Sequence, residues 1–110
     1  MSELAFKRRS TSILNNSNDD HINTYVAIAT SEGRPITSIQ QYTSRVGQFA
    51  RWLDRDLLTV TLEDIENWAN EGNAYKKNHI TAFYKTFLTH NVNDFQDNID
   101  KDLLIYLAVH

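Results

Sequence analysis

Tyrosine, histidine and carboxylate side chains are the residues of this chain whose chemistry suits catalysis. The four histidines are scattered, with no pair at the i, i+4 spacing of one helix face and no HExxH motif, so no metal site is predicted. The carboxylate pairs Asp19-Asp20 and Glu63-Asp64 fall at predicted turns or helix starts, where capping and the positive end of the helix explain them. Five tyrosines are possible nucleophiles, but no arginine and histidine accompany them at a recognisable spacing, which favours packing roles. We therefore expect no catalytic residue and no metal.

Cofactor chemistry finds no support in the sequence either. A phosphate-binding loop needs clustered glycines that let backbone amides approach the anion, whereas Gly33, Gly47 and Gly72 are isolated. Cysteine is absent, which excludes thiol nucleophiles, cysteine-based zinc sites and disulfides and agrees with a reducing compartment. No apolar run reaches the roughly 18 residues needed to span a bilayer, and residues 1–16 lack the apolar segment of a signal peptide. We expect a cytoplasmic protein with no cofactor and no membrane partner.

Charge is distributed unevenly along the chain. The net charge of −3 argues at first against a nucleic-acid binder, because lysine and arginine usually neutralise the phosphates. Between Asn73 and Asn93, however, there are three lysines, two histidines and no acid, and four arginines occur between residues 34 and 55. The acids gather in residues 63–71 and 94–102. This alternation is compatible with one basic and one acidic face, and equally with an ordinary solvated surface.

The length and composition predict one compact domain. A chain of 110 residues with 41% hydrophobic and 23% charged residues can bury a single core. Residues 1–16 are polar, with Lys7, Arg8 and Arg9 among them, and show no helical or strand period. Two interpretations remain for this segment, a mobile terminus and a basic arm that follows a nucleic-acid backbone. We expect the folded bundle over residues 17–92, followed by a C-terminal helix or linker over residues 93–110.

The first two helices are predicted from their apolar periodicity. From residue 17 or 18 onward, apolar residues recur at the i, i+3, i+4, i+7 spacing of a helix that ends near Gly33. Pro35 prevents continuation, and Thr37 is the predicted N-cap of a second helix because Gln40 stands three residues on, as in a capping box. The second helix has the clearest apolar stripe of the chain, formed by Ile39, Tyr42, Val46, Phe49 and Leu53.

Three further helices complete the predicted fold. Thr61 is the expected N-cap of a third helix, with Asp64 at the third position, and Gly72 is expected to end it. A fourth helix begins near residues 73–74 and places Ile80 and Phe83 in its apolar stripe. Residues 102–109 (DLLIYLAV) form a short apolar run that predicts a fifth helix, either docked on the bundle or belonging to a further part of the protein. With no repeat and no strand alternation, the fold class is all-α, a compact bundle of four to five helices.

The order of these segments resembles a known family. TSIQQY at residues 37–42 opens a helix that closes with FARWL at 49–53, and LTVTLEDI follows at 58–65. The segment AYKKNHITAFYKTFL at 74–88 has a polar start that leads into an aromatic stripe. These four pieces, in this order, are similar to the core-binding domain of tyrosine recombinases, the phage integrase family. The likeness covers roughly residues 17–92 and implies a SAM-like four-helix bundle.

In that family the bundle forms one jaw of a clamp on double-stranded DNA, and the second and fourth helices present their starts to the major groove. Lysine and arginine suit phosphate neutralisation, hydroxyls suit phosphate oxygens, and glutamine or asparagine can read base edges. Each of these residues alone is also typical of ordinary solvated surface. Carried onto this chain, the resemblance implies DNA contacts from Thr37, Ser38, Gln41, Arg45, Lys76, Lys77, Asn78, Thr81 and Lys85.

The resemblance also limits the expected activity. The family's catalytic arginine, histidine and tyrosine lie in a separate C-terminal domain, so this chain alone is expected to hold DNA without cutting it. We expect a non-catalytic part of a recombinase whose partners are double-stranded DNA, a catalytic domain in the full-length chain and further copies on DNA. Two alternatives stay open. One is a recombinase-like repressor or accessory factor, and the other is a helical protein-interaction module that uses the acidic third helix and the apolar tail.

Overall fold

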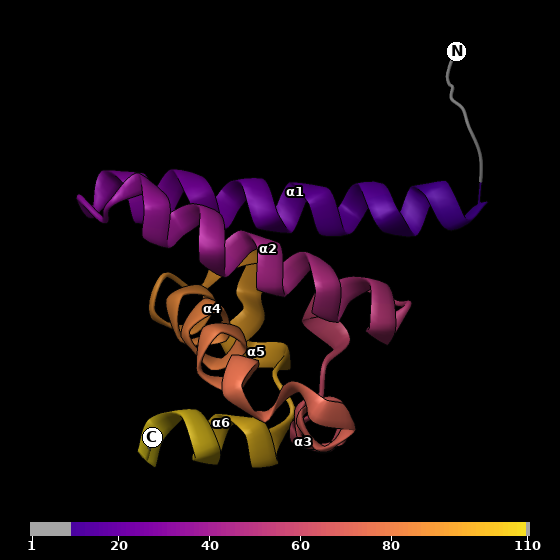
Figure 1. Ribbon diagram of the computed structural model, residues 1–110. Coiled ribbons are helices and arrows are strands. Elements are labelled where there is room, and N and C mark those ends of the chain that lie inside the picture. Colours follow the sequence, from indigo (N-terminus) through magenta and orange to yellow (C-terminus); the bar gives the residue numbers. More distant parts are fainter. Residues whose placement is uncertain (1–9, 110) are drawn as a thin grey trace.

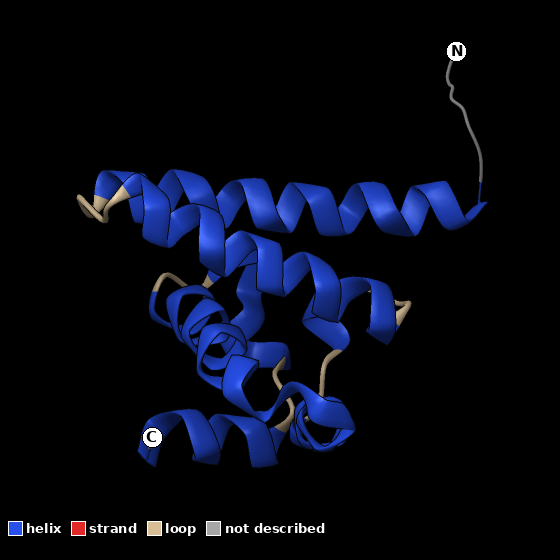
Figure 2. Cartoon of the chain, viewed as in Figure 1, coloured by secondary structure: helices blue, strands red, loops and turns tan. Residues whose placement is uncertain are grey.

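The computed structural model of this chain describes the backbone of residues 10–109 and the side chains from residue 17 to residue 109. Within this range the chain consists of helices joined by short turns, and no strand is present (Figure 2). The predicted all-α class is confirmed. No helix in the described part of the chain combines the length and apolarity needed to cross a membrane. The predicted N-terminal arm covers residues 1–16, and its residues 1–9 lie outside the described part of the chain.

Helix α1 (Ser10–Ser31) lies along α2 (Ile36–Leu53) at one side of the molecule (Figure 1). The predicted start of the first helix at residue 17 or 18 was wrong, because α1 begins at Ser10. Residues 10–16 carry no apolar period, so their helical state could not be read from pattern. The chain reverses between the helices through Gly33, whose φ of +78° is the left-handed conformation that glycine adopts without strain.

The start of α2 differs from the predicted capping box. Pro35 occupies the N-cap position in an extended conformation and provides no side-chain cap. The helix therefore begins at Ile36 and includes Thr37 in its first turn, where the hydroxyl is no longer placed to cap it. Farther along α2 the predicted apolar stripe is confirmed, with Tyr42 only half-buried and four members in the core: Ile39, Val46, Phe49 and Leu53.

The start of α3 (Leu62–Trp68) agrees with prediction. The Thr61 hydroxyl accepts a hydrogen bond from the Asp64 amide at 3.1 Å, and the Asp64 carboxylate accepts one from the Thr61 amide at 2.9 Å. This reciprocal pair is a capping box. After Trp68 the chain passes through an irregular turn over Ala69–Asn73, in which Gly72 takes a φ of +91°. Helix α3 thus ends at Trp68, before the predicted stop, and Gly72 lies in the turn that follows it.

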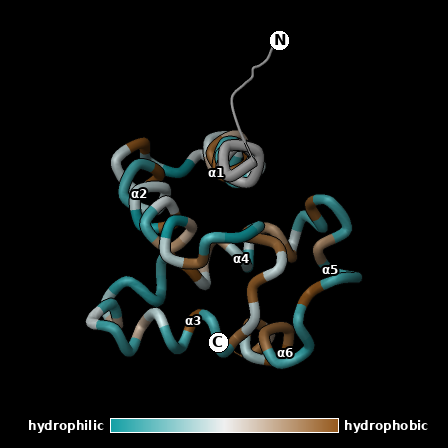
Figure 3. Tube along the Cα trace, turned by 90° about the vertical axis from the view of Figure 1, so that its right-hand side faces the viewer, coloured by the Kyte–Doolittle hydropathy of each residue, from teal (hydrophilic) through white to brown (hydrophobic). Residues whose placement is uncertain are grey.

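Helix α4 (Lys77–Thr89) is central in the bundle, with α1 and α2 on one side of it and α3 and α6 on the other (Figures 1 and 3). A short 3₁₀ turn over Ala74–Lys76 leads into it. Aromatic and aliphatic side chains of α4 are fully buried, namely Ile80, Phe83, Tyr84 and Phe87. Phe83 and Phe87 have ring centroids 4.5 Å apart, and the Phe83 and Tyr25 centroids are 5.4 Å apart, which joins α4 to α1.

The C-terminal segment packs into the same core. After α5 (Phe95–Asn98), the chain forms α6 (Lys101–Val109), which carries much of the hydrophobic sequence near the C-terminus (Figure 3). Phe95, Leu103 and Leu107 are buried in one cluster with the residues of α4. The core therefore continues past residue 92, and the predicted fifth helix docks on the bundle.

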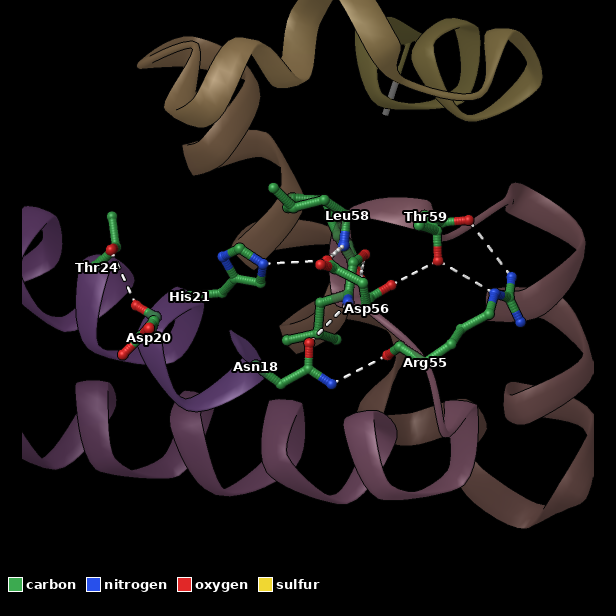
Figure 4. A network of polar contacts seen from close by, with 10 residues as sticks. Asn18, Asp20, His21, Thr24, Arg55, Asp56, Leu58 and Thr59 are labelled. Carbon is green, nitrogen blue, oxygen red and sulfur yellow. Dashed lines mark hydrogen bonds and ion pairs between the residues drawn. The ribbon is translucent and has the colours of Figure 1, made fainter. Parts of the chain in front are cut away.

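A polar network fixes the loop between α2 and α3 against α1 (Figure 4). The side-chain amide of Asn18, on α1, donates to the Arg55 carbonyl at 3.0 Å, and its oxygen accepts from the Leu57 amide at 2.8 Å. One turn along α1, His21 Nε2 lies 3.1 Å from a carboxylate oxygen of Asp56. These contacts replace the backbone partners that an irregular segment lacks, so the loop holds a fixed position.

Candidate nucleic-acid interface

Helices α2 and α4 pack against each other, and neither carries a carboxylate. Residues 36–53 contain two arginines and no Asp or Glu, and residues 74–89 contain three lysines and no Asp or Glu. The acids of the described chain lie on other elements, including the first half of α1, the α2–α3 loop, α3 and residues 94–102. These two segments therefore bring only positive charges to the seam, although the whole chain has a net charge of −3. From outside them, the Glu71 carboxylate contacts α2 by accepting a hydrogen bond from Trp52 Nε1 at 3.0 Å.

A cluster of cations and one aromatic ring joins the two elements. The Arg45 guanidinium, on α2, lies 5.4 Å from the ring centroid of Tyr75, and the Lys76 ammonium lies 5.4 Å from the same centroid. Lys76 Nζ also donates to Gln48 Oε1 at 2.8 Å. Two positive charges are thereby held over one ring, an arrangement that attracts an anion.

Tyr42 and His79 form the next contact along the seam. Their ring centroids are 4.6 Å apart, with the planes perpendicular, so an edge of one ring meets the face of the other. Burial lowers the pKa of the His79 imidazole, and the nearby positive charge of Arg45 lowers it further. His79 is therefore neutral at pH 7 and adds an aromatic contact, not a charge, to this surface.

The other end of the seam lies at the α1–α2 turn. Lys85 and Ala82 of α4 line a pocket of about 180 Å³ together with Arg34 and His90. In this pocket the Glu32 carboxylate accepts from Arg34 Nε at 3.1 Å and lies 3.1 Å from His90 Nε2. The hydrogen bond from His90 and the charge and hydrogen bond of Arg34 lower the pKa of Glu32. The negative charge of this carboxylate is therefore balanced by its own partners at the edge of the seam.

Most of the residues predicted to contact DNA share this surface. On α2, Ser38, Gln41 and Arg45 follow one another at spacings of three and four, so they lie on one side of the helix. Asn78 and Lys85 are likewise two turns apart on one side of α4. Thr37 is exposed in the first turn of α2. We define the α2–α4 face as the surface formed by Thr37, Ser38, Gln41, Arg45, Tyr75, Lys76, Asn78 and Lys85.

Two predicted contacts do not belong to the α2–α4 face. Thr81 is only 9% exposed, and its hydroxyl donates to the Asn78 carbonyl at 3.1 Å, so its prediction as a DNA contact is corrected. It lies on the inner side of α4, beside the buried Ile80. The Lys77 side chain lies toward α6, with its ammonium 5.0 Å from the ring centroid of Tyr106. Lys76 and Lys77 are therefore neighbours in sequence that serve different surfaces.

Sequence reasoning missed Tyr75, which is a member of the face, and Gln48, which accepts the hydrogen bond of Lys76. The sequence favours a packing role for Tyr75, yet this side chain is 69% exposed. A signal was present, because Tyr75 lies outside the apolar stripe that contains Ile80 and Phe83 and stands directly before two lysines. Gln48 carries no such signal, since its role depends on a lysine 28 residues away in the chain.

Comparison of the chain with models of protein families, with curated proteins and with solved structures finds no match in any of the three.

Proposed function

We propose that this chain is a DNA-binding helical module that holds double-stranded DNA on the α2–α4 face. The observation that carries the proposal is the segregation of charge. Every member of the face comes from α2 or from residues 74–89, and these two segments contain no carboxylate. The cations of the face are Arg45, Lys76 and Lys85. A phosphate backbone brought to this seam meets cations without a repelling acid on either segment. The polar side chains between the cations, such as Gln41 and Asn78, are suited to hydrogen bonds with bases or phosphates.

The resemblance to tyrosine-recombinase core-binding domains supports the same proposal from the sequence. That family uses its second and fourth helices on DNA, and the resemblance would make α2 and α4 their counterparts in this chain. In this proposal the bundle is a SAM-like clamp jaw and cutting belongs to a separate catalytic domain. Two of the five tyrosines fit that division, since Tyr25 and Tyr84 are buried and burial raises the pKa of both phenols. A phenol with a raised pKa is a poorer nucleophile.

The experiment is a fluorescence anisotropy titration of a labelled duplex with the protein at low and moderate salt, about 50 mM and about 200 mM. We expect binding at the lower salt concentration that weakens by at least about tenfold at the higher one, because a few phosphate contacts release several counterions. A repressor or accessory factor of the same fold would give the same result, and the presence of the catalytic residues in the full-length protein separates it from a recombinase. Absence of binding at low salt would overturn the DNA proposal.

A second candidate function is association with another protein through α6. Ile105 is 63% exposed and Val109 is 74% exposed, and both line an apolar pocket with Leu62 and Tyr106. Exposed aliphatic residues that gather at one pocket are typical of interaction surfaces. Sedimentation of the purified chain across a concentration series tests self-association at this surface. A monomer at all concentrations would contradict self-association through α6.

A further inference from the structure

Tyr75 is an aromatic side chain that the fold leaves open on the α2–α4 face. Although two cations lie over its ring, each 5.4 Å from the centroid, 69% of the residue remains exposed. Its neighbours do not bury it, in contrast to Trp68 and Phe83, which are in the core. An exposed ring flanked by two cations has the two components of a site for single-stranded nucleic acid, a stacking surface and positive charges for the adjoining phosphates.

The two cations over the Tyr75 ring are held by the bundle. Arg45 is on α2 and Lys76 follows Tyr75 in the 3₁₀ turn, so the two cations come from different elements of the bundle. Lys76 is itself restrained, because its ammonium donates to Gln48 and lies 6.0 Å from the Trp68 ring centroid. A restrained pair of cations loses less conformational freedom when it binds phosphate than two free side chains do.

An intact duplex does not use such a ring. Bases in a duplex are stacked on each other, so their faces are closed to a protein side chain, and only their edges, the sugars and the phosphates are accessible. An unpaired base costs much less to unstack and can place its face on Tyr75 while the adjoining phosphates meet Arg45 and Lys76.

We propose that Tyr75 is a stacking site for an unpaired DNA base and that the α2–α4 face therefore binds DNA containing such a base more tightly than an intact duplex. This inference rests on the proposed function, since it takes the same face as the DNA site. It adds a preference that the charges alone do not give, because cations bind the phosphates of paired and unpaired DNA alike.

The test compares two labelled duplexes of the same sequence at low salt, one fully paired and one with a single unpaired thymine at its centre. We expect the wild-type protein to bind the bulged duplex about fivefold or more tightly, the lower end of the effect of stacking one base on an aromatic side chain. Tyr75→Ala should bind both duplexes with equal affinity. Tyr75→Phe should keep the preference, because the ring and not the hydroxyl makes the stack.

Asn67→Ala is the control, since it removes an exposed side chain from α3, away from the α2–α4 face. It should leave the preference unchanged, and far-UV circular dichroism verifies that every variant is folded. Equal wild-type affinity for the two duplexes would overturn the stacking inference and leave the DNA proposal standing. A preference that survives in Tyr75→Ala would overturn its assignment to this residue. No binding to either duplex would overturn both proposals.

Discussion

The ring of Tyr42, on α2, meets the ring of His79, on α4, at a centroid distance of 4.6 Å and at a right angle. This contact couples the two helices that form the α2–α4 face. It also places a titratable group near Arg45, whose charge acts on His79. The geometry of the candidate DNA site and the ionisation of one histidine are therefore linked.

His79 should titrate below the ordinary histidine pKa of about 6.5. Burial and the charge of Arg45 both lower its pKa in the folded protein, so the folded state binds the proton more weakly than the unfolded chain does. The contribution of His79 to stability is thus fully present above about pH 6.5 and is lost as the pH falls through the folded pKa. A pH titration of the His79 ring signals by NMR measures this directly. A midpoint at or above about 6.5 would contradict the burial of this ring.

Asn18→Ala should destabilise the fold by about 2 kcal/mol, because it leaves the buried Leu57 amide without its acceptor and the Arg55 carbonyl without its donor. Urea unfolding followed by circular dichroism measures the change. Asn23→Ala is the control, since Asn23 is exposed on the same helix. A loss for Asn18→Ala no larger than that of the control would show that the amide does not hold the loop.

Thr61→Ala should lower the free energy of unfolding by about 1 kcal/mol, because it removes the acceptor of the Asp64 amide in the capping box. Thr37→Ala should change it by less than about 0.5 kcal/mol, since Thr37 is exposed inside the first turn of α2 and caps nothing there. The two variants remove the same side chain from two positions with similar sequence signatures. Equal losses in urea unfolding would contradict the difference between these two helix starts.

Lys77→Ala should affect DNA binding less than Lys76→Ala. The Lys76 ammonium lies beside Tyr75 on the α2–α4 face, whereas the Lys77 ammonium lies beside Tyr106 of α6. Anisotropy titrations over a series of salt concentrations should give a salt slope reduced by about 1 for Lys76→Ala and little changed for Lys77→Ala. The reverse order would place the DNA over α6.

Features that depend on neighbouring residues could be predicted from the sequence. The capping box of Thr61 and Asp64 was readable because both partners lie within one helical turn. Gly72 indicated the turn after the third helix, because glycine adopts its left-handed conformation without strain, but not the end of the helix at Trp68. The same reasoning failed at Thr37, which was the predicted N-cap of the second helix. Pro35 occupies the N-cap position instead, so the helix begins at Ile36. Residues 10–16 have no apolar period, so local pattern could not reveal their helical state.

The candidate site was predictable from the sequence only where its residues lie close together on one helix. The helical spacing of Gln41 and Arg45 places both on one side of α2 whatever the rest of the fold does. The inward direction of Thr81 and the separation of Lys77 from Lys76 depend on where α4 lies against the other helices. Arg45 and Tyr75 meet across the α2–α4 seam although they are far apart in the chain, and no local pattern contains such a contact.

Binding of DNA across the α2–α4 face through its cations is tested most directly by the salt dependence of the affinity. The double variant Arg45→Ala, Lys76→Ala should reduce the slope of log affinity against log salt by about 1.8 relative to wild type, at about 0.9 for each phosphate that is no longer neutralised. Lys101→Ala, which removes an exposed lysine from α6, is the control with an expected slope equal to that of wild type. A wild-type slope retained by the double variant, or a slope reduced equally by the control, would contradict the account.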